Sequence, residues 1–134
     1  MWQTIKMHGF SVNRMYNQFK RRSKKYNEWT DQMLTEMKQL RTLEELNINP
    51  DKPMKIEIVF NTIRGYDLDN LIKSFLDVLV KYYKLEDDNN FVDIHLIRGT
   101  EFKDTIDEGE ITFAIKNCEG NILNKIDKVC AKIK

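Results

Sequence analysis

The chain has 134 residues, of which 41% are hydrophobic and 32% charged, with five glycines and two prolines. This composition is typical of a folded protein and argues against a disordered or low-complexity chain, and the length suits one domain that gains from oligomerisation. No apolar run approaches the ~20 residues that a membrane span needs, and the first residues lack the apolar segment of a signal peptide. We therefore expect a single domain over residues 1–134, located in the cytoplasm and not in a membrane.

The formal net charge of +1 hides an uneven distribution of charge along the chain. The first 27 residues contain seven basic side chains and no acidic one, and the first acid is Glu28. The two cysteines, Cys118 and Cys130, have no group of histidines near them in the sequence, so we interpret them as structural thiols and not as zinc ligands. The basic N-terminal part is the more informative feature.

The first half of the chain predicts a strand, a helix and a second strand. Alternation over residues 2–7 favours a short strand that ends in a turn at Gly9. Apolar residues at three- and four-residue spacing predict an amphipathic helix over 24–46, which the segment 47–53 ends. Alternation then predicts a half-buried strand from Met54 to about residue 63.

The second half contains the clearest helix of the sequence, over residues 68–83, with Asp67 before it as a natural N-cap. Alternation predicts two more strands, over 92–96 and 111–115, which we expect to pair antiparallel through the acidic loop between them. A short amphipathic helix is predicted over 121–133, with subunit contact and capping of the domain equally open as its role. The elements together predict an α+β or mixed α/β fold, a mixed sheet flanked by helices.

Residues with chemical potential gather at the start of the helix predicted over 68–83. Asp67 and Asp69 stand where a strand gives way to a helix, and the helix dipole and free N–H groups there favour ionised carboxylates. Lys73 follows Asp69 by four residues, which places its ammonium one turn away on nearly the same face. Clustered carboxylates are ligands that Mg²⁺ prefers, and such a metal can activate water and stabilise charge on a phosphate while Lys73 stabilises the developing negative charge.

Simpler interpretations of the same residues remain open from spacing alone. An aspartate at a helix start is usually a cap, and an aspartate–lysine pair four residues apart is usually a surface ion pair worth roughly 0.2–0.5 kcal/mol. An EF-hand calcium loop is excluded, because Leu71 and Ile72 occupy the positions that need a polar ligand and a glycine.

Several separated segments resemble, in the same order, motifs of one protein family. Their residues are Ser11-Val12-Asn13-Arg14-Met15-Tyr16 for S-x-N-x-x-Y, Asp67-Leu68-Asp69-Asn70-Leu71-Ile72-Lys73 for D-x-D-N-x-x-K, Asp77-Val78-Leu79 for D-x-L, and Asp87-Asp88-Asn89-Asn90-Phe91-Val92 for D-D-x-x-I/V. Tyr26 and Trp29 are similar to an aromatic pair that follows the first motif. The chain thus resembles the RusA family of Holliday-junction resolvases over roughly residues 2–115, and residues 117–134 lie outside the clear match.

The resemblance implies a homodimeric endonuclease that resolves four-way DNA junctions with Mg²⁺, for which Mn²⁺ could substitute, in a bacterial or prophage setting of recombination and repair. Carried over residue by residue, Asp67, Asp69 and Asp88 would be the metal-binding and catalytic carboxylates, and Lys73 the essential lysine. Two positions depart from the family pattern. His8-Gly9-Phe10 replaces a proline-rich lead, and Tyr66 stands where a basic residue often precedes the first aspartate, with Arg64 as a substitute.

The length of the predicted helix bears on how these carboxylates could meet. A helix of about 16 residues separates its ends by roughly 24 Å, so Asp69 and Asp88 would lie at opposite ends of it. A single chain could gather both carboxylates only if the helix broke early or the following loop doubled back, whereas a two-fold dimer could set Asp67 and Asp69 of one subunit against Asp88 of the other. We expect such a composite site, two to a dimer, which suits paired cuts in a junction.

The basic N-terminal part, interleaved with aromatic residues, is typical of a segment that contacts DNA phosphates; a solvated helix end is the simpler interpretation. The residues expected to contact DNA are Asn13, Arg14, Lys20, Arg21, Arg22, Lys24, Lys25 and Arg64. His8 and His95 are isolated and are given no catalytic role. A non-catalytic junction-binding accessory protein and a broader nuclease of forks or flaps remain as alternatives.

Overall fold

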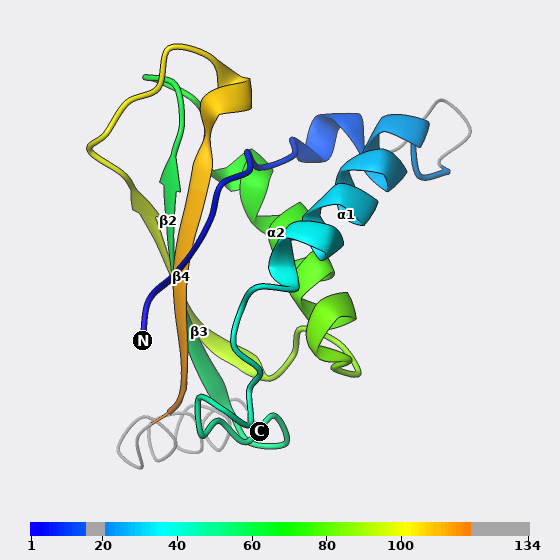
Figure 1. Ribbon diagram of the computed structural model, residues 1–134, viewed down its shortest axis with the longest axis vertical. Helices are drawn as coiled ribbons and strands as arrows, with labels where there is room; N and C mark the ends of the chain where they lie inside the picture. The colour runs from blue at the N-terminus through cyan, green and yellow to red at the C-terminus, as the bar shows by residue number, and fades with distance from the viewer. Residues whose placement is uncertain (16–20, 119–134) are drawn as a thin grey trace, which may run out of the picture.

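The computed structural model describes residues 1–15 and 21–118 of the chain. Over these residues it forms a small α+β fold in which a sheet carries its helices on one face (Figure 1). None of the helices in these ranges is long and apolar enough to cross a membrane. The tail helix expected over 121–133 lies outside the described residues. The elements in chain order are β1 (Gln3–Ile5), the 3₁₀ turn η1 (Val12–Arg14), α1 (Lys24–Met37), β2 (Met54–Asn61), α2 (Asp69–Tyr83), β3 (Phe91–Arg98), the 3₁₀ turn η2 (Ile106–Glu108) and β4 (Glu110–Asn117).

The four strands form one mixed sheet in the order β1-β4-β2-β3. β2 and β3 are parallel and are joined through α2, whereas β4 runs antiparallel to both β2 and β1. The mixed sheet flanked by helices expected from the sequence is therefore present.

The pairing expected between the last two strands is wrong. β4 does not pair with β3 but inserts between β1 and β2, where Ile58 lies opposite Phe113. The physical reason is burial: Phe113 of β4 is fully buried under the helices, while Ile94 and Ile97 of β3 are 42% and 39% exposed. The strand whose alternate residues Ile111, Phe113 and Ile115 are all buried takes a central place in the sheet, and β3 is left at the edge.

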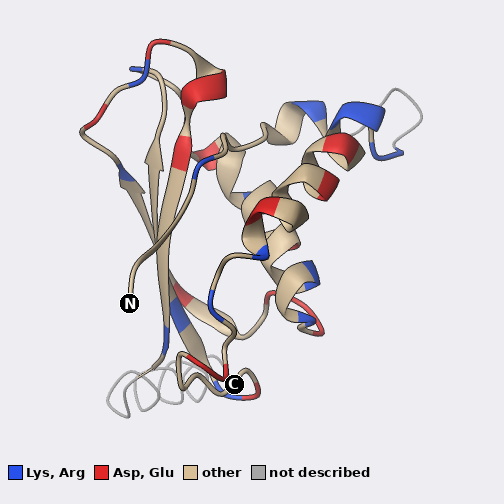
Figure 2. Cartoon of the chain, viewed as in Figure 1, with Lys and Arg blue, Asp and Glu red and all other residues tan. Residues whose placement is uncertain are grey.

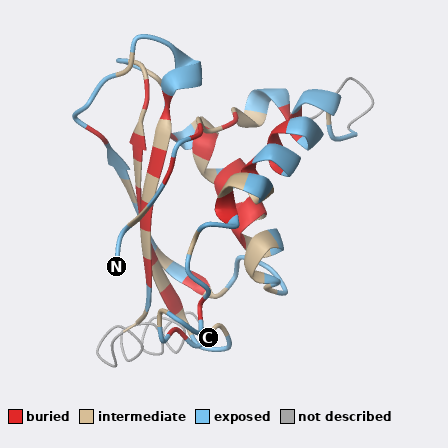
Figure 3. Cartoon of the chain, viewed as in Figure 1, coloured by how far each residue is buried: buried red, intermediate tan, exposed pale blue. Residues whose placement is uncertain are grey.

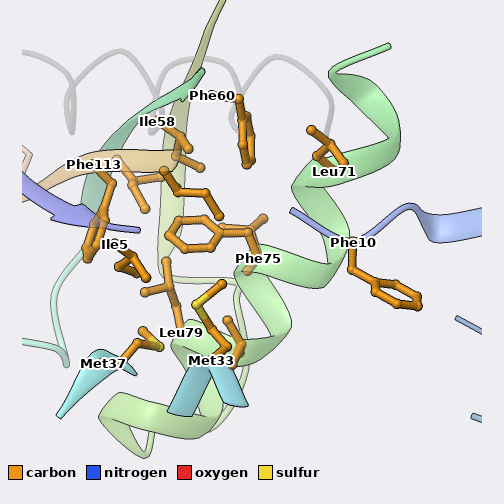
Figure 4. Close-up of a cluster of buried hydrophobic side chains, with 14 of the residues drawn as sticks. Ile5, Phe10, Met33, Met37, Ile58, Phe60, Leu71, Phe75, Leu79 and Phe113 are labelled. Atoms are coloured by element: carbon orange, nitrogen blue, oxygen red, sulfur yellow. The ribbon is translucent and has the colours of Figure 1, made fainter. Parts of the chain in front are cut away.

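The core lies between the sheet and the two helices. Alternate residues of β2 and β4 are buried on the helix side of the sheet, and the helices turn their buried faces toward them (Figure 3). Phe75 of α2 is fully buried at the centre of this layer, with its ring 6.1 Å from that of Phe60 and 5.4 Å from that of Phe113 (Figure 4). Both pairs meet edge to face, an arrangement that adds stability beyond the burial of area.

The helix expected over 24–46 ends at Met37, nine residues early. The backbone turns after Lys38, and a capping box then starts a new turn: Glu45 N–H donates to Thr42 Oγ1 at 3.1 Å, and Thr42 N–H donates to the Glu45 carboxylate at 3.2 Å. This reciprocal pair is a signal for a chain entering a new helical turn, and T-x-x-E is readable in the sequence. The regular spacing of apolar residues across the break concealed it.

Hydrogen bonds from buried side chains fix the N-terminal segment against both helices. The Ser74 hydroxyl of α2 donates to the Phe10 carbonyl at 2.6 Å, and Trp29 Nε1 of α1 donates to the His8 carbonyl at 2.9 Å. Between them, Gly9 passes so close to α2 that an added Cβ would lie 3.1 Å from the Leu71 side chain. The segment that leads into the basic part of the chain is thereby attached to the helix that carries the acidic residues.

Candidate active site

A tight turn between β2 and α2 carries the first two candidate carboxylates. Gly65 adopts a positive φ of 80°, a backbone conformation that is strained for residues with a side chain. The chain then enters α2 at Asp69. The expectation that Asp67 caps this helix holds only in part: Leu68 occupies the N-cap position, and the Asp67 carboxylate accepts the N–H of Asp69 at 3.1 Å. Asp67 and Asp69 are both exposed, so their remaining oxygens face solvent.

Two arginines brace this turn. Arg98, the last residue of β3, donates from Nη1 to the Tyr66 carbonyl at 2.8 Å. The guanidinium of Arg64, an expected DNA contact, lies 4.1 Å from the centre of the Phe102 ring. Both arginines are exposed, so they combine a bracing contact with a positive charge beside the aspartates.

Lys73 lies on the exposed side of α2, one turn after Asp69. Its ammonium pairs with Asp77 at 4.0 Å, one turn further along the helix, and not with Asp69. Asp77 also accepts a hydrogen bond from the hydroxyl of Tyr26 of α1, at 3.4 Å. In the sequence Asp77 stood out only as part of the D-x-L motif and was not placed in the site, although its spacing of four residues from Lys73 was readable.

Asp88 lies in the turn beyond the other end of α2. The helix ends in a left-handed residue, Lys84, with φ 56°, and the Asp88 carbonyl then accepts the N–H of Phe91 as β3 begins. With 15 residues in α2, its first and last residues are about 21 Å apart along the helix axis. α2 is unbroken, and within the described residues Asp88 does not join Asp67 and Asp69 in a group that could hold a metal ion.

The described residues contain no group of three or more His, Cys, Asp or Glu side chains that could hold a metal ion. The Asp67 and Asp69 pair nevertheless fits Mg²⁺ in its chemistry, because this cation is commonly held by one or two carboxylates with waters and substrate oxygens completing its shell. Any third protein carboxylate would come from outside this turn.

A hollow of about 470 Å³ connects Lys73 to the Asp88 end of the molecule. It runs between α1 and α2, and both acidic and basic side chains line it. Its walls are formed by Arg22, Tyr26, Thr30, Lys73, Asp77, Val78, Val80, Lys81, Lys84, Leu85, Glu86, Asp87 and Asp88. Two expected site residues, Lys73 and Asp88, and one expected DNA contact, Arg22, thus share one surface, whereas Asp67 and Asp69 do not line it.

In the basic segment beside this hollow, hydrogen bonds join Ser23 to Arg14 and Met15. The Ser23 hydroxyl donates to the Arg14 carbonyl at 2.7 Å, and Ser23 N–H donates to the Met15 carbonyl at 2.7 Å, so the two ends of the segment meet. Basic residues follow one another along η1 and the start of α1, which lie close together (Figure 2).

The expected DNA contacts that fall in the described ranges all lie at the surface. Asn13, Arg14, Arg21, Arg22, Lys24, Lys25 and Arg64 are exposed, and Lys20 lies outside the described residues. Lys24 forms an exposed ion pair with Glu28 at 4.0 Å. Exposed cations beside one another are suited to phosphate contact, and an ion pair of this kind is easily exchanged for a phosphate.

No protein-family model matches the chain, and no curated protein matches it significantly. The resemblance to the RusA family therefore rests on the motif residues themselves and stays a prediction.

Proposed function

We propose that the protein is a Mg²⁺-dependent endonuclease that resolves four-way DNA junctions by paired phosphodiester cuts. The observation that carries the proposal is the surface of α2. Two exposed carboxylates open the helix, an exposed lysine follows one turn later, and the hollow beside that lysine contains Asp88 and leads to a cluster of arginines and lysines. Acids, a lysine and a phosphate-binding segment are the groups that metal-assisted hydrolysis of DNA needs.

Each group has a part in the proposed reaction. Asp67, Asp69 and Asp88 would hold the metal, and Lys73 would stabilise negative charge on the scissile phosphate. The metal, when bound, supplies activation of water and neutralisation of charge on phosphate oxygens. The exposed cations at the start of α1 would bind the sugar–phosphate backbone without reading the base sequence.

A homodimer with composite sites completes this proposal. Two copies of α2 related by a two-fold axis perpendicular to them run antiparallel, so the start of each lies beside the end of the other. Such a dimer brings Asp67 and Asp69 of one subunit to Asp88 of its partner without bending the helix.

The exposed edge strand β3 favours an interface with a second copy of the chain. By the strand register Ile94 lies next to Ile56 on the helix face of the sheet, yet on this edge strand it is 42% exposed whereas Ile56 is fully buried. Val92 is equally exposed, and β3 has an unpaired edge within the described part of the chain. Exposed apolar side chains on an open strand edge favour contact with another chain.

The test is cleavage of a labelled four-way junction with Mg²⁺, beside linear duplex, fork and flap controls. Wild type should cut opposite strands of the junction at symmetric positions, and Asp69→Asn should abolish cutting but leave junction binding. The matched control is Asp31→Asn, an exposed aspartate on α1 that should cut like wild type. Junction binding without cutting in Mg²⁺ or Mn²⁺ would favour the accessory protein, and equal cutting of forks and flaps would favour the broader nuclease.

A further inference from the structure

Asp77 differs from the other acids near the hollow in its burial and in its partners. Its side chain is 25% exposed, whereas Asp67, Asp69 and Asp88 are exposed. It contacts two groups from different helices, the Lys73 ammonium at 4.0 Å and the Tyr26 hydroxyl at 3.4 Å.

Tyr26 is the more rigid of these two partners. It is 1% exposed, and its ring lies 5.4 Å from that of Phe10 and 6.1 Å from that of Trp29. Burial raises the pKa of Tyr26 to about 12, with the Asp77 charge adding to the shift, so its hydroxyl keeps the proton that it donates. The aromatic cluster therefore holds one oxygen of Asp77 in place.

Arg22 extends this arrangement to the basic segment. Its guanidinium lies 5.3 Å from the centre of the Tyr26 ring, on the same hollow as Lys73 and Asp77. One chain of contacts thus runs from an expected DNA-binding residue through Tyr26 and Asp77 to Lys73.

We propose that Asp77 is a positioning residue, which with Tyr26 holds the Lys73 ammonium over the hollow between α1 and α2. The inference rests on the function proposed above, because Lys73 acts there on the scissile phosphate. A lysine side chain has several rotatable bonds and loses much freedom when it is fixed. A carboxylate that is itself fixed by a buried tyrosine lowers that cost at the moment of reaction, and small misplacements of a reacting group reduce rates strongly.

A purely structural ion pair makes a different prediction from a positioning pair. The Lys24–Glu28 pair of α1 has the same spacing of four residues and the same distance of 4.0 Å, but both side chains are exposed. It provides a matched control for kcat, since a pair of this kind stabilises a helix by about 0.3–0.5 kcal/mol and neither of its side chains lines the hollow that contains Lys73.

The experiment compares junction cleavage by wild type, Asp77→Asn, Tyr26→Phe and Glu28→Gln, with kcat separated from junction affinity and with thermal unfolding of each variant. Asp77→Asn should lower kcat by about 10- to 100-fold with affinity and thermal midpoint close to wild type, Tyr26→Phe should lower kcat less, and Glu28→Gln should keep it. An unchanged kcat for Asp77→Asn would overturn the proposal, and so would a decrease that follows a matching fall in thermal stability.

A second measurement separates this inference from the proposed activity. Lysines labelled by reductive methylation give NMR signals, and the Lys73 signal is assigned by its disappearance in Lys73→Arg. In Asp77→Asn and Tyr26→Phe the Lys73 signal should shift and sharpen as the side chain gains freedom, even if the wild type cuts no DNA. A Lys73 signal unchanged in both variants would show that Asp77 does not position the ammonium.

Discussion

Replacement of Ser74 by alanine tests how the basic N-terminal segment is attached to α2. Ser74 is fully buried, and its hydroxyl donates to the Phe10 carbonyl at 2.6 Å. Alanine removes the donor and leaves that carbonyl without its bond in a buried position, which costs about 1–3 kcal/mol. For a chain of this size a decrease of 1 kcal/mol in stability lowers the thermal midpoint by about 4 °C.

We therefore expect Ser74→Ala to lower the free energy of unfolding by about 1–3 kcal/mol and the midpoint by roughly 4–12 °C. Urea unfolding followed by circular dichroism gives the first value, and a thermal scan gives the second. Thr35→Ala is the control, because Thr35 Oγ1 makes its bond to the Asp31 carbonyl at an exposed position. A Ser74→Ala protein as stable as the control would refute the role assigned to this bond.

Further predictions concern charge, pH and the turn after α1. Lys24→Ala with Lys25→Ala should weaken junction binding and lower the slope of log affinity against log salt by about 0.9 for each phosphate that is no longer neutralised, as measured by fluorescence anisotropy, while Lys52→Ala leaves the slope unchanged. Because the pKa of Tyr26 is about 12 in the folded protein and 10.0 ordinarily, its contribution to stability is complete below pH 10 and disappears as the pH rises toward 12. As the pH rises above 10, the urea midpoint of Tyr26→Phe should therefore fall less than that of wild type. Thr42→Ala removes the capping box and should cost about 1 kcal/mol in the same unfolding assay.

Some elements could be predicted from the sequence because one face of each is continuously apolar. The helix expected over 68–83 is observed as Asp69–Tyr83, and the strand expected from Met54 is observed as Met54–Asn61. Both pack against the centre of the core, where spacing of apolar residues and burial agree.

The neighbours of a strand could not be predicted in the same way. Alternation shows which side chains of β4 face the core, but it carries no information on whether β2 or β3 lies beside them. The early end of α1 was readable in principle from the capping box at Thr42 and Glu45, since that motif marks a new start even where apolar spacing continues.

The candidate site likewise has a part that could be predicted from the sequence and a part that could not. Sequence position was enough to predict that Asp67 and Asp69 open a helix and that Asp88 follows its end. The contact between Tyr26 and Asp77 joins residues 51 positions apart, and it depends on how α1 packs on α2. No local pattern predicts such a contact, so the hollow and the partner of Lys73 required the structure.

The central claim is that each nuclease site takes Asp69 from one subunit and Asp88 from the other. It is tested most directly by a heterodimer of one Asp69→Asn subunit and one Asp88→Asn subunit, purified through two different tags. In a composite arrangement one of its two sites keeps both wild-type aspartates, so the heterodimer should nick one strand of a four-way junction although both mutant homodimers are inactive. A heterodimer as inactive as its two parents would contradict the composite site.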